Sequence, residues 1–280
     1  QIVFTGSSIV DISKQEGDLS RRALMYELQG LSYREYLHYQ YGLEYPVLKL
    51  EELLNSKESI RSLFPKDFKP LANFREYLKF GYYPYQTEDR LGYFQRLRQQ
   101  SRLIVEYDMA ELKGFDIRHA KKMLQLLFVV SQQVPFKPNI NKLAEKTGIH
   151  RNSINNYLYF LEEARLLSLL QASGSSTALL QKPEKIFMEN SNLLYALSED
   201  APDIGSVREV FFHNQVSAKH KLSMPKSGDF MIDGNYVVEI GGKNKDSRQI
   251  LDLPNSWLVK DDLEYPVGKS IPLSLFGFLY

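Results

Sequence analysis

The residues whose types and spacing could do chemistry gather in the last third of the chain. Asp229 and Glu239 lie on two runs of β-type residues joined by an Asp-Gly-Asn turn, and Lys243 follows the second run. Two carboxylates on neighbouring strands can hold a Mg²⁺ ion, and a lysine beside them can assist attack of water on a phosphodiester. Glu209, on a helix predicted upstream, is a fourth candidate. The pattern predicts a phosphodiester-cleaving site with Asp229 and Glu239 as metal ligands.

An acid, a hairpin and then a Glu with a nearby Lys is an order that resembles the PD-(D/E)-x-K nuclease core. In that core the lysine stands two residues after the Glu, where this chain has Gly241, and Lys243 comes two residues later. A lysine that follows a Gly-Gly bend can point elsewhere. The alternative is therefore a degenerate core whose acids serve structure.

Residues 140–160 match a helix-turn-helix motif. Ala144, Gly148 and Ile154 fall at its fifth, ninth and fifteenth positions. These positions need a small residue where the helices approach, a Gly in the turn and an apolar residue in the small core. The exposed start of the second helix offers side chains that can reach bases or phosphates in the major groove of DNA. These side chains are Arg151, Asn152, Ser153, Asn155 and Asn156.

A β-hairpin is predicted after this motif, with strands at 166–172 and 178–181 around the turn at 173–176. A helix-turn-helix followed by a hairpin is typical of a winged helix. Residues 118–165 carry eight Lys or Arg and three Glu, a local basic surplus that suits a DNA partner. The alternative is a winged helix that only connects domains.

The composition narrows the remaining classes of function. The chain has 35 Lys plus Arg, 34 Asp plus Glu and no Cys. The near balance of charge argues against a polybasic nucleic-acid binder, and the lack of Cys excludes disulfides, thiolate metal sites and a cysteine nucleophile. No P-loop is present, and the five His show no metal-ligand spacing. We expect a cytoplasmic protein without a membrane partner, because no apolar run could span a bilayer.

The elements that must position these residues can be read from caps and periodicity. Ser32 and Glu35 form a capping box, which predicts a helix over 33–41 that ends at Gly42. Further helices are expected at 71–80, 89–105, 121–133, 151–164 and 207–221, and strands at 228–232 and 236–240. At the start, residues 2–5 read as a short buried strand with nothing before it, which suggests that a longer protein precedes Gln1.

Several segments together resemble a prokaryotic AAA-type ATPase family. They are Ile2–Ser8, Asp18–Ala23, Tyr26–Leu28, Leu31–Leu37, Gly81–Pro84, the helix-turn-helix, Gly228–Phe230 and Glu239–Lys243. The first of them is similar to the sensor-1 strand of that family. The segments from Gly81 onward are similar to its C-terminal half, which in that family ends in a domain of unknown function with a nuclease-like core. The resemblance implies a longer parent protein that binds ATP and Mg²⁺ through Walker motifs upstream of Gln1.

The resemblance also implies roles for four residues near the start. Ser7 or Ser8 would orient water near the γ-phosphate, and Arg21 or Arg22 would act as an arginine finger. The alternatives are a helix N-cap for the serines and an ion pair with Asp18 or Glu27 for the arginines.

The expected fold is therefore α+β in three parts. Residues 1–117 would be the end of an AAA-type domain with its helical lid, 118–200 a winged helix-turn-helix, and 201–280 a restriction-endonuclease-like α/β domain. The expected function is that of the C-terminal portion of an ATP-binding protein, without ATP hydrolysis by this chain alone, and with DNA and self-association as candidate interactions. A non-enzymatic DNA-binding module and a Mg²⁺-dependent nuclease are the two alternatives.

Overall fold

The computed structural model of the chain describes residues 26–107 except 56–59, 61, 63, 66 and 67, and residues 117–172, 182–246, 248–250 and 252–280. Within these ranges the fold is mixed α+β, with helices, a two-stranded antiparallel sheet and a five-stranded mixed sheet. The strand predicted at 2–5 lies outside the described residues. No helix in the described part of the chain is long and apolar enough to cross a membrane.

The first described helix, α2 (Tyr33–Tyr41), has the predicted ends. The Ser32 hydroxyl accepts a hydrogen bond from the Glu35 N–H at 3.1 Å, and the Glu35 carboxylate accepts one from the Ser32 N–H at 2.9 Å. Gly42 ends the helix in the left-handed conformation, with φ of 65°. The capping box therefore forms as the sequence predicts.

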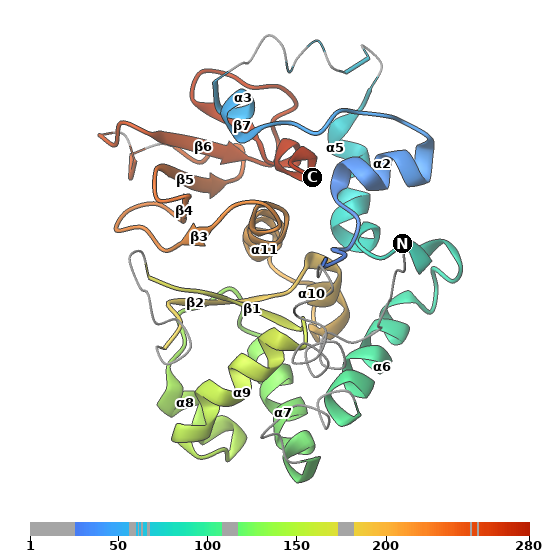
Figure 1. Cartoon of the computed structure of the whole chain (residues 1–280), viewed down its shortest axis with the longest axis vertical. Helices are drawn as coiled ribbons and strands as arrows, with labels where there is room; N and C mark the ends of the chain where they lie inside the picture. The colour runs from blue at the N-terminus through green and yellow to red at the C-terminus, as the bar shows by residue number, and fades with distance from the viewer. Residues whose placement is uncertain are drawn as a thin grey trace, which may run out of the picture.

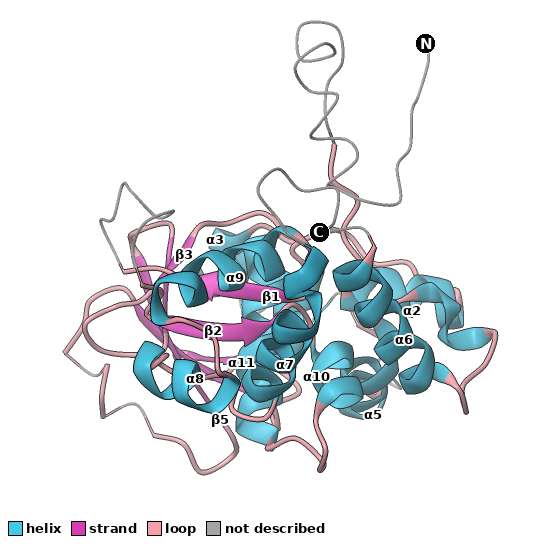
Figure 2. Cartoon of the chain, turned by 90° about the horizontal axis from the view of Figure 1, so that it is seen from below, coloured by secondary structure: helices cyan, strands magenta, loops and turns pink. Residues whose placement is uncertain are grey.

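Helices α3 (Leu50–Asn55), α5 (Pro70–Glu76) and α6 (Tyr93–Glu106) follow, and α5 continues into a π-helical turn over Tyr77–Gly81. The helix predicted from Asp89 begins later, because the Asp89 carboxylate accepts a hydrogen bond from the Gly92 N–H at 2.9 Å and closes a turn there. Figure 2 shows α2, α5 and α6 grouped beside the rest of the molecule.

The middle of the chain contains α7 (Ala120–Ser131), α8 (Ile140–Thr147) and α9 (Arg151–Glu163). Gly148 joins α8 to α9 with φ of 62°, and its N–H donates to the Ala144 carbonyl at 2.9 Å. Ile154 is fully buried between the helices. The helix, turn and helix predicted at 140–160 are therefore present.

Strand β1 (Leu167–Leu170) pairs antiparallel with β2 (Lys185–Met188), with Leu167 opposite Met188. The segment predicted to pair with this strand, 178–181, lies outside the described residues. The partner observed comes from farther along the chain, so the loop between the two paired strands is longer than a tight turn.

The last part of the chain contains α10 (Ser191–Leu197), α11 (Ile204–Ser217) and the five-stranded sheet. Its strands run in the order β3 (Leu222–Ser223), β4 (Phe230–Ile232), β5 (Tyr236–Gly241), β6 (Ser256–Lys260) and β7 (Ser270–Pro272). The pairs β3–β4 and β4–β5 are antiparallel, whereas β5–β6 and β6–β7 are parallel. A parallel pair needs a crossover, and residues 242–255 supply it between β5 and β6.

Helix α11 lies between the five-stranded sheet and the β1–β2 pair (Figure 1). Phe212 contacts Phe230 on β4, with 5.1 Å between ring centroids, and His213 stacks on Phe187 of β2 at 4.6 Å. Buried apolar side chains from all three predicted units form one core cluster. The three-part division of the chain stays a prediction.

Candidate functional site

Glu239 on β5 is the most deeply buried of the predicted site residues, with 1% of its surface exposed. Two groups bind its carboxylate. The Lys245 ammonium forms an ion pair with Oε1, and the Gln249 amide, oriented with its nitrogen toward the acid, donates to Oε1 and Oε2 at 3.0 and 3.2 Å. Burial raises the pKa of Glu239, with Lys245 acting in the opposite direction. A buried carboxylate held by a cation and an amide is costly to build, because both charges must leave water.

The lysine that contacts Glu239 is Lys245, whereas the sequence pattern named Lys243. Lys243 is exposed, and its carbonyl accepts a hydrogen bond from the Lys260 ammonium at 3.1 Å. A Cβ on Gly241 would lie 2.3 Å from the Cβ and Cγ of Lys245. The Lys245 side chain therefore passes directly over Gly241, the position at which the E-x-K pattern expects its lysine. A lysine from four residues later takes the space that this glycine leaves.

Asp229 stands beside Glu239 at the start of β4. Its carboxylate oxygen Oδ2 accepts a hydrogen bond from the Ile240 N–H at 2.7 Å, and its own N–H donates to the Val238 carbonyl at 2.9 Å. These two bonds fix the acid on the strand that carries Glu239. Asp229 is also close enough for its negative charge to contribute to the raised pKa of Glu239. The structure thus brings together the two acids that the sequence paired.

Glu209 reaches the same region from α11, whose first turn is capped by Asp203. Its carboxylate forms an ion pair with the Lys185 ammonium at the start of β2. Burial raises the pKa of Glu209, Lys185 lowers it, and the negative charges of Asp229 and Glu239 raise it further. Three carboxylates and two ammonium groups therefore share one partly buried cluster.

Sequence reasoning missed Lys185, Lys245 and Gln249. Lys185 begins an apolar strand far from the acids in sequence, and only the fold brings β2 to α11. Gln249 lies on the crossover after β5, where nothing in its type or spacing marks it. The second lysine after the Gly-Gly bend was a visible signal for Lys245.

The donor set of the cluster fits a magnesium ion shared with a substrate better than a metal held by protein alone. Among the described residues, no group of three or more His, Asp or Glu is placed to hold a metal ion by itself. Magnesium is commonly bound by one or two carboxylates, with waters and substrate phosphates completing its shell. Asp229 and Glu239 supply two such carboxylates on adjacent strands.

The second group of predicted site residues begins α9. Arg151, Asn152 and Asn156 are exposed, whereas Ser153 and Asn155 are half-buried. The His150 ring nitrogen caps the helix by accepting from the Asn152 N–H at 3.3 Å. Within the described residues, the side-chain oxygen of Asn155 is buried without a hydrogen-bond partner. Three of the five side chains therefore remain available to a ligand.

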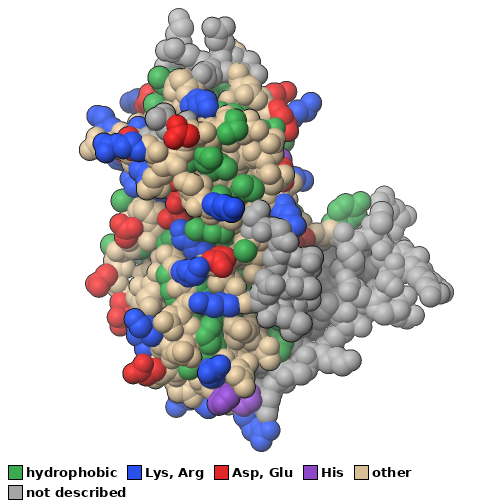
Figure 3. All heavy atoms as spheres, turned by 90° about the vertical axis from the view of Figure 1, so that its left-hand side faces the viewer, with side chains coloured by type: hydrophobic (Ala, Val, Ile, Leu, Met, Phe, Trp, Pro, Cys, Tyr) green, Lys and Arg blue, Asp and Glu red, His purple; other side chains and the backbone are tan. Residues whose placement is uncertain are grey.

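The charge around this helix is mixed. Exposed lysines lie on α7 and α8, namely Lys121, Lys122, Lys142 and Lys146. Figure 3 shows one face of the molecule, on which Lys and Arg side chains alternate with acidic and apolar ones. Lys and Arg side chains therefore form no continuous basic surface on the face shown.

The remaining candidates, Ser7, Ser8, Arg21 and Arg22, lie outside the described residues. Glu27, one of the alternative ion-pair partners for the arginines, pairs with Arg165. Arg165 has φ of 55° and also lies 3.7 Å from the buried Glu189. The roles that the resemblance implies for these four residues stay predictions.

Comparison with known proteins gives one family match and one relative. Residues 71–203, from α5 to the N-cap of α11, match the model of a family described as a domain of unknown function, DUF8612. The chain is similar to the uncharacterized protein MJ1637 of Methanocaldococcus jannaschii, with 27% identity over 272 residues that cover 89% of this chain and 57% of that protein. No solved structure matches the chain. The DUF8612 match includes the helix-turn-helix but ends before Glu209, Asp229 and Glu239. The chain is thus a distant homologue of an uncharacterized archaeal protein.

Proposed function

We propose that the chain cleaves phosphodiester bonds of DNA with Mg²⁺, at the cluster formed by Glu209, Asp229, Glu239, Lys245 and Gln249. The observation that carries this proposal is the convergence of Lys245 and Gln249 on the buried carboxylate of Glu239, beside Asp229. For stability alone, an apolar residue at this position would often serve as well as a buried acid with two polar partners, because the charged groups must be desolvated. The arrangement has the parts of a PD-(D/E)-x-K nuclease site, with the lysine displaced along the chain.

Each residue has a distinct task in this proposal. Asp229 and Glu239 would hold the Mg²⁺ ion, which supplies charge to the phosphate and acidifies a bound water. Lys245 lies against Glu239, so its ammonium is placed to orient the attacking water and to balance the negative charge that gathers on phosphorus. Water would attack phosphorus and give up one proton to solvent, the P–O bond to the leaving sugar would break, and the leaving oxygen would take up one proton from solvent.

The other two polar groups keep this arrangement in place. Gln249 fixes the plane of the Glu239 carboxylate through two hydrogen bonds. Glu209 and Lys185 form an ion pair that joins α11 to β2, so part of the site is held by the strand that follows the helix-turn-helix. The hydrogen bonds and ion pairs among these groups favour a fixed geometry over a mobile one.

The helix-turn-helix supports a second candidate function, DNA binding without cleavage. The order α8, turn, α9, β1 and β2 is that of a winged helix, and the exposed polar start of α9 suits the major groove. Under this proposal Arg151→Ala weakens duplex binding and makes its salt dependence shallower. Binding that is unchanged in this variant, measured by fluorescence anisotropy across a salt series, contradicts it.

Cleavage is tested with supercoiled plasmid and the full chain of 280 residues. We expect nicking that needs Mg²⁺, stops with a chelator, and is lost in Glu239→Gln and in Asp229→Asn. Glu199→Gln, at an exposed acid outside the cluster, serves as the matched control and should cleave normally. Thermal melting of each variant shows that it is folded. Nicking that survives both cluster substitutions, or none from a folded wild-type chain, contradicts the proposal.

A relation to AAA-type ATPases is the third part of the proposal and rests on sequence resemblance alone. The chain spans 57% of the length of its archaeal relative, and the implied sensor and finger residues precede the described part. We expect the chain by itself not to hydrolyse ATP, since it has no P-loop. ATP turnover that follows the purified chain and falls in Arg22→Ala would overturn this expectation.

A further inference from the structure

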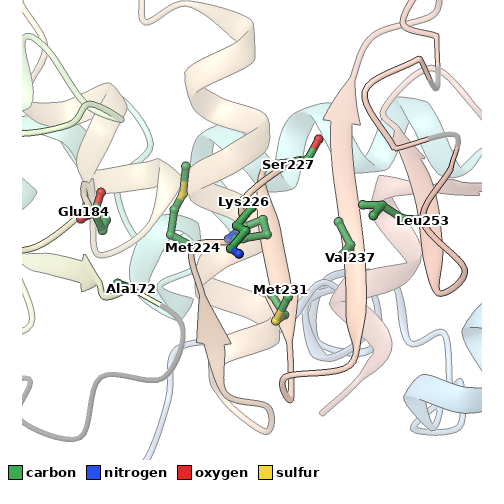
Figure 4. A pocket seen from close by; sticks show the side chains of 9 residues that line it. Ala172, Glu184, Met224, Lys226, Ser227, Met231, Val237 and Leu253 are labelled. Atoms are coloured by element: carbon green, nitrogen blue, oxygen red, sulfur yellow. The ribbon is translucent and has the colours of Figure 1, made fainter.

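A cavity of about 570 Å³ opens between the β1–β2 pair and the five-stranded sheet. In Figure 4, Ala172 and Glu184 lie on one side of it, Val237 and Leu253 on the other, and Met224, Lys226 and Met231 between them. Pro225 and Ser227 complete the lining. Its size falls within the range of small-molecule sites in proteins.

The cavity shares a face of the sheet with the acid cluster. Side chains alternate along a strand, so Val237 projects from the same face of β5 as Glu239, about 7 Å farther back along the strand. Met231 lies directly opposite Val237 on β4. Ser227 donates a hydrogen bond to the Gln249 carbonyl at 2.5 Å, and the Gln249 side chain binds Glu239. The cavity and the cluster are therefore neighbours, connected through Ser227 and Gln249.

The walls of the cavity suit a flat aromatic ring. Met224 and Met231 place thioethers on it, and Val237 and Leu253 supply an apolar surface. Thioether sulfurs make favourable contacts with aromatic rings, and methionine adapts to their shape. Enzymes that take up a nucleobase commonly hold it between apolar side chains.

Two charged groups at the cavity distinguish a nucleotide from a plain apolar ligand. Lys226 is exposed at the rim, where its ammonium can pair with a phosphate. Glu184 is an acceptor on the opposite side, held by an ion pair between its Oε2 and the Lys137 ammonium at 2.6 Å. A carboxylate accepts hydrogen bonds from the amino group of cytosine, which uracil and thymine lack.

We propose that this cavity binds a nucleobase of the strand whose phosphodiester the acid cluster cleaves, with a preference for cytosine over thymine. The proposal rests on the proposed function, because the cluster defines the strand. Apolar walls hold the ring, Glu184 accepts from its amino group, and Lys226 pairs with the phosphate. The site would thus give the nuclease a base preference without a contact in the major groove.

The test measures binding, so it is independent of cleavage. The full chain is labelled with ¹³C at its methionine methyls and titrated with deoxycytidine monophosphate or deoxyuridine monophosphate, which differ at the amino group. We expect the cytidine nucleotide to shift Met224 and Met231 while Met123, buried in α7, stays in place. The uridine nucleotide should bind about tenfold more weakly, which is the value of one hydrogen bond to a charged group.

Two variants test separately the role of the Glu184 carboxylate and the role of the cavity itself. Glu184→Leu should bring cytidine binding down to the uridine level, and Leu253→Trp, which places a larger side chain in the cavity wall, should weaken both. Equal affinity for the two nucleotides, or no shift of Met224 and Met231, overturns the inference. Glu199→Gln, at an exposed acid outside the cluster and the cavity, is the control and should bind as the wild type does. Binding without cleavage therefore contradicts the proposed function alone, and cleavage without binding contradicts only this inference.

Discussion

His213 on α11 is a buried imidazole that senses the charge of Lys185. It stacks on Phe187, and burial, reinforced by the charge of Lys185, lowers its pKa from 6.5 to about 4. Between pH 6.5 and about pH 4 this imidazole is therefore protonated in the unfolded chain but neutral in the folded chain. The free energy of unfolding consequently falls as the pH drops through this range. His213→Phe keeps a ring at this position without the titration.

We expect the wild type to lose roughly 2–3 kcal/mol more stability than His213→Phe between pH 7 and pH 4.5, because each pKa unit corresponds to about 1.4 kcal/mol. Urea unfolding at the two pH values measures the difference. Because the change in stability between the two pH values is compared, any pH-independent cost of replacing the His213 ring cancels. Parallel pH dependence of the two proteins would show that His213 is already charged in the fold.

For individual residues, the sequence predicts the acids of the cluster better than the lysines and the glutamine that bind them. Asp229 and Glu239 are visible because both flank a short hairpin, and a hairpin places neighbours in sequence beside each other in space. Lys185 and Gln249 reach the cluster only through α11 and the β5–β6 crossover. Lys243 was chosen for proximity in sequence, but the Gly-Gly bend carries it to the surface and brings Lys245 back over Gly241.

Among the elements, the turn between α8 and α9 depends on one glycine. Gly148 has φ of 62°, and a Cβ there would meet nothing within 4 Å. The cost of a side chain is therefore conformational, and Gly148→Ala should lower stability by about 1 kcal/mol. Gly148→Asn is the matched control and should cost less, because Asn tolerates the left-handed region. Thermal melting that ranks Ala equal to or above Gly would contradict this.

Local signals predicted the elements that local interactions determine. The capping box gave both ends of α2, and the spacing of Ala144, Gly148 and Ile154 gave the α8–α9 turn. The pairing of β1 was beyond such signals, because its partner β2 begins 15 residues after β1 ends and also contacts α11. A strand partner chosen by tertiary packing leaves little trace in a single sequence.

At the scale of the whole molecule, the parts are joined by shared core contacts. The indole N–H of Trp257 on β6 donates to the Leu54 carbonyl at the end of α3, at 3.1 Å. On α10, Asn192 accepts from the Tyr82 N–H at 2.9 Å and from the Tyr93 hydroxyl at 2.6 Å. Residues distant in sequence thus depend on one another for buried hydrogen bonds.

We therefore expect one cooperative unfolding transition for the described parts. Trp257 is the single tryptophan, so its fluorescence reports on β6, while far-ultraviolet circular dichroism reports on all helices. The two signals should give the same urea midpoint. Midpoints that differ would show that the sheet and the helical part unfold separately, as the predicted division into three domains would allow.

Two lysine substitutions distinguish a role of Lys245 in phosphodiester cleavage from a general effect of positive charge near the cluster. Lys245→Met removes the ammonium on Glu239, and Lys243→Met removes an exposed ammonium two residues away. The measurement is the rate of Mg²⁺-dependent plasmid nicking by each folded variant. We expect a loss of at least about a hundredfold for Lys245→Met, in the range for a group that assists proton transfer or charge stabilisation, and an unchanged rate for Lys243→Met. Equal rates for the two variants, or a loss confined to Lys243→Met, would contradict it.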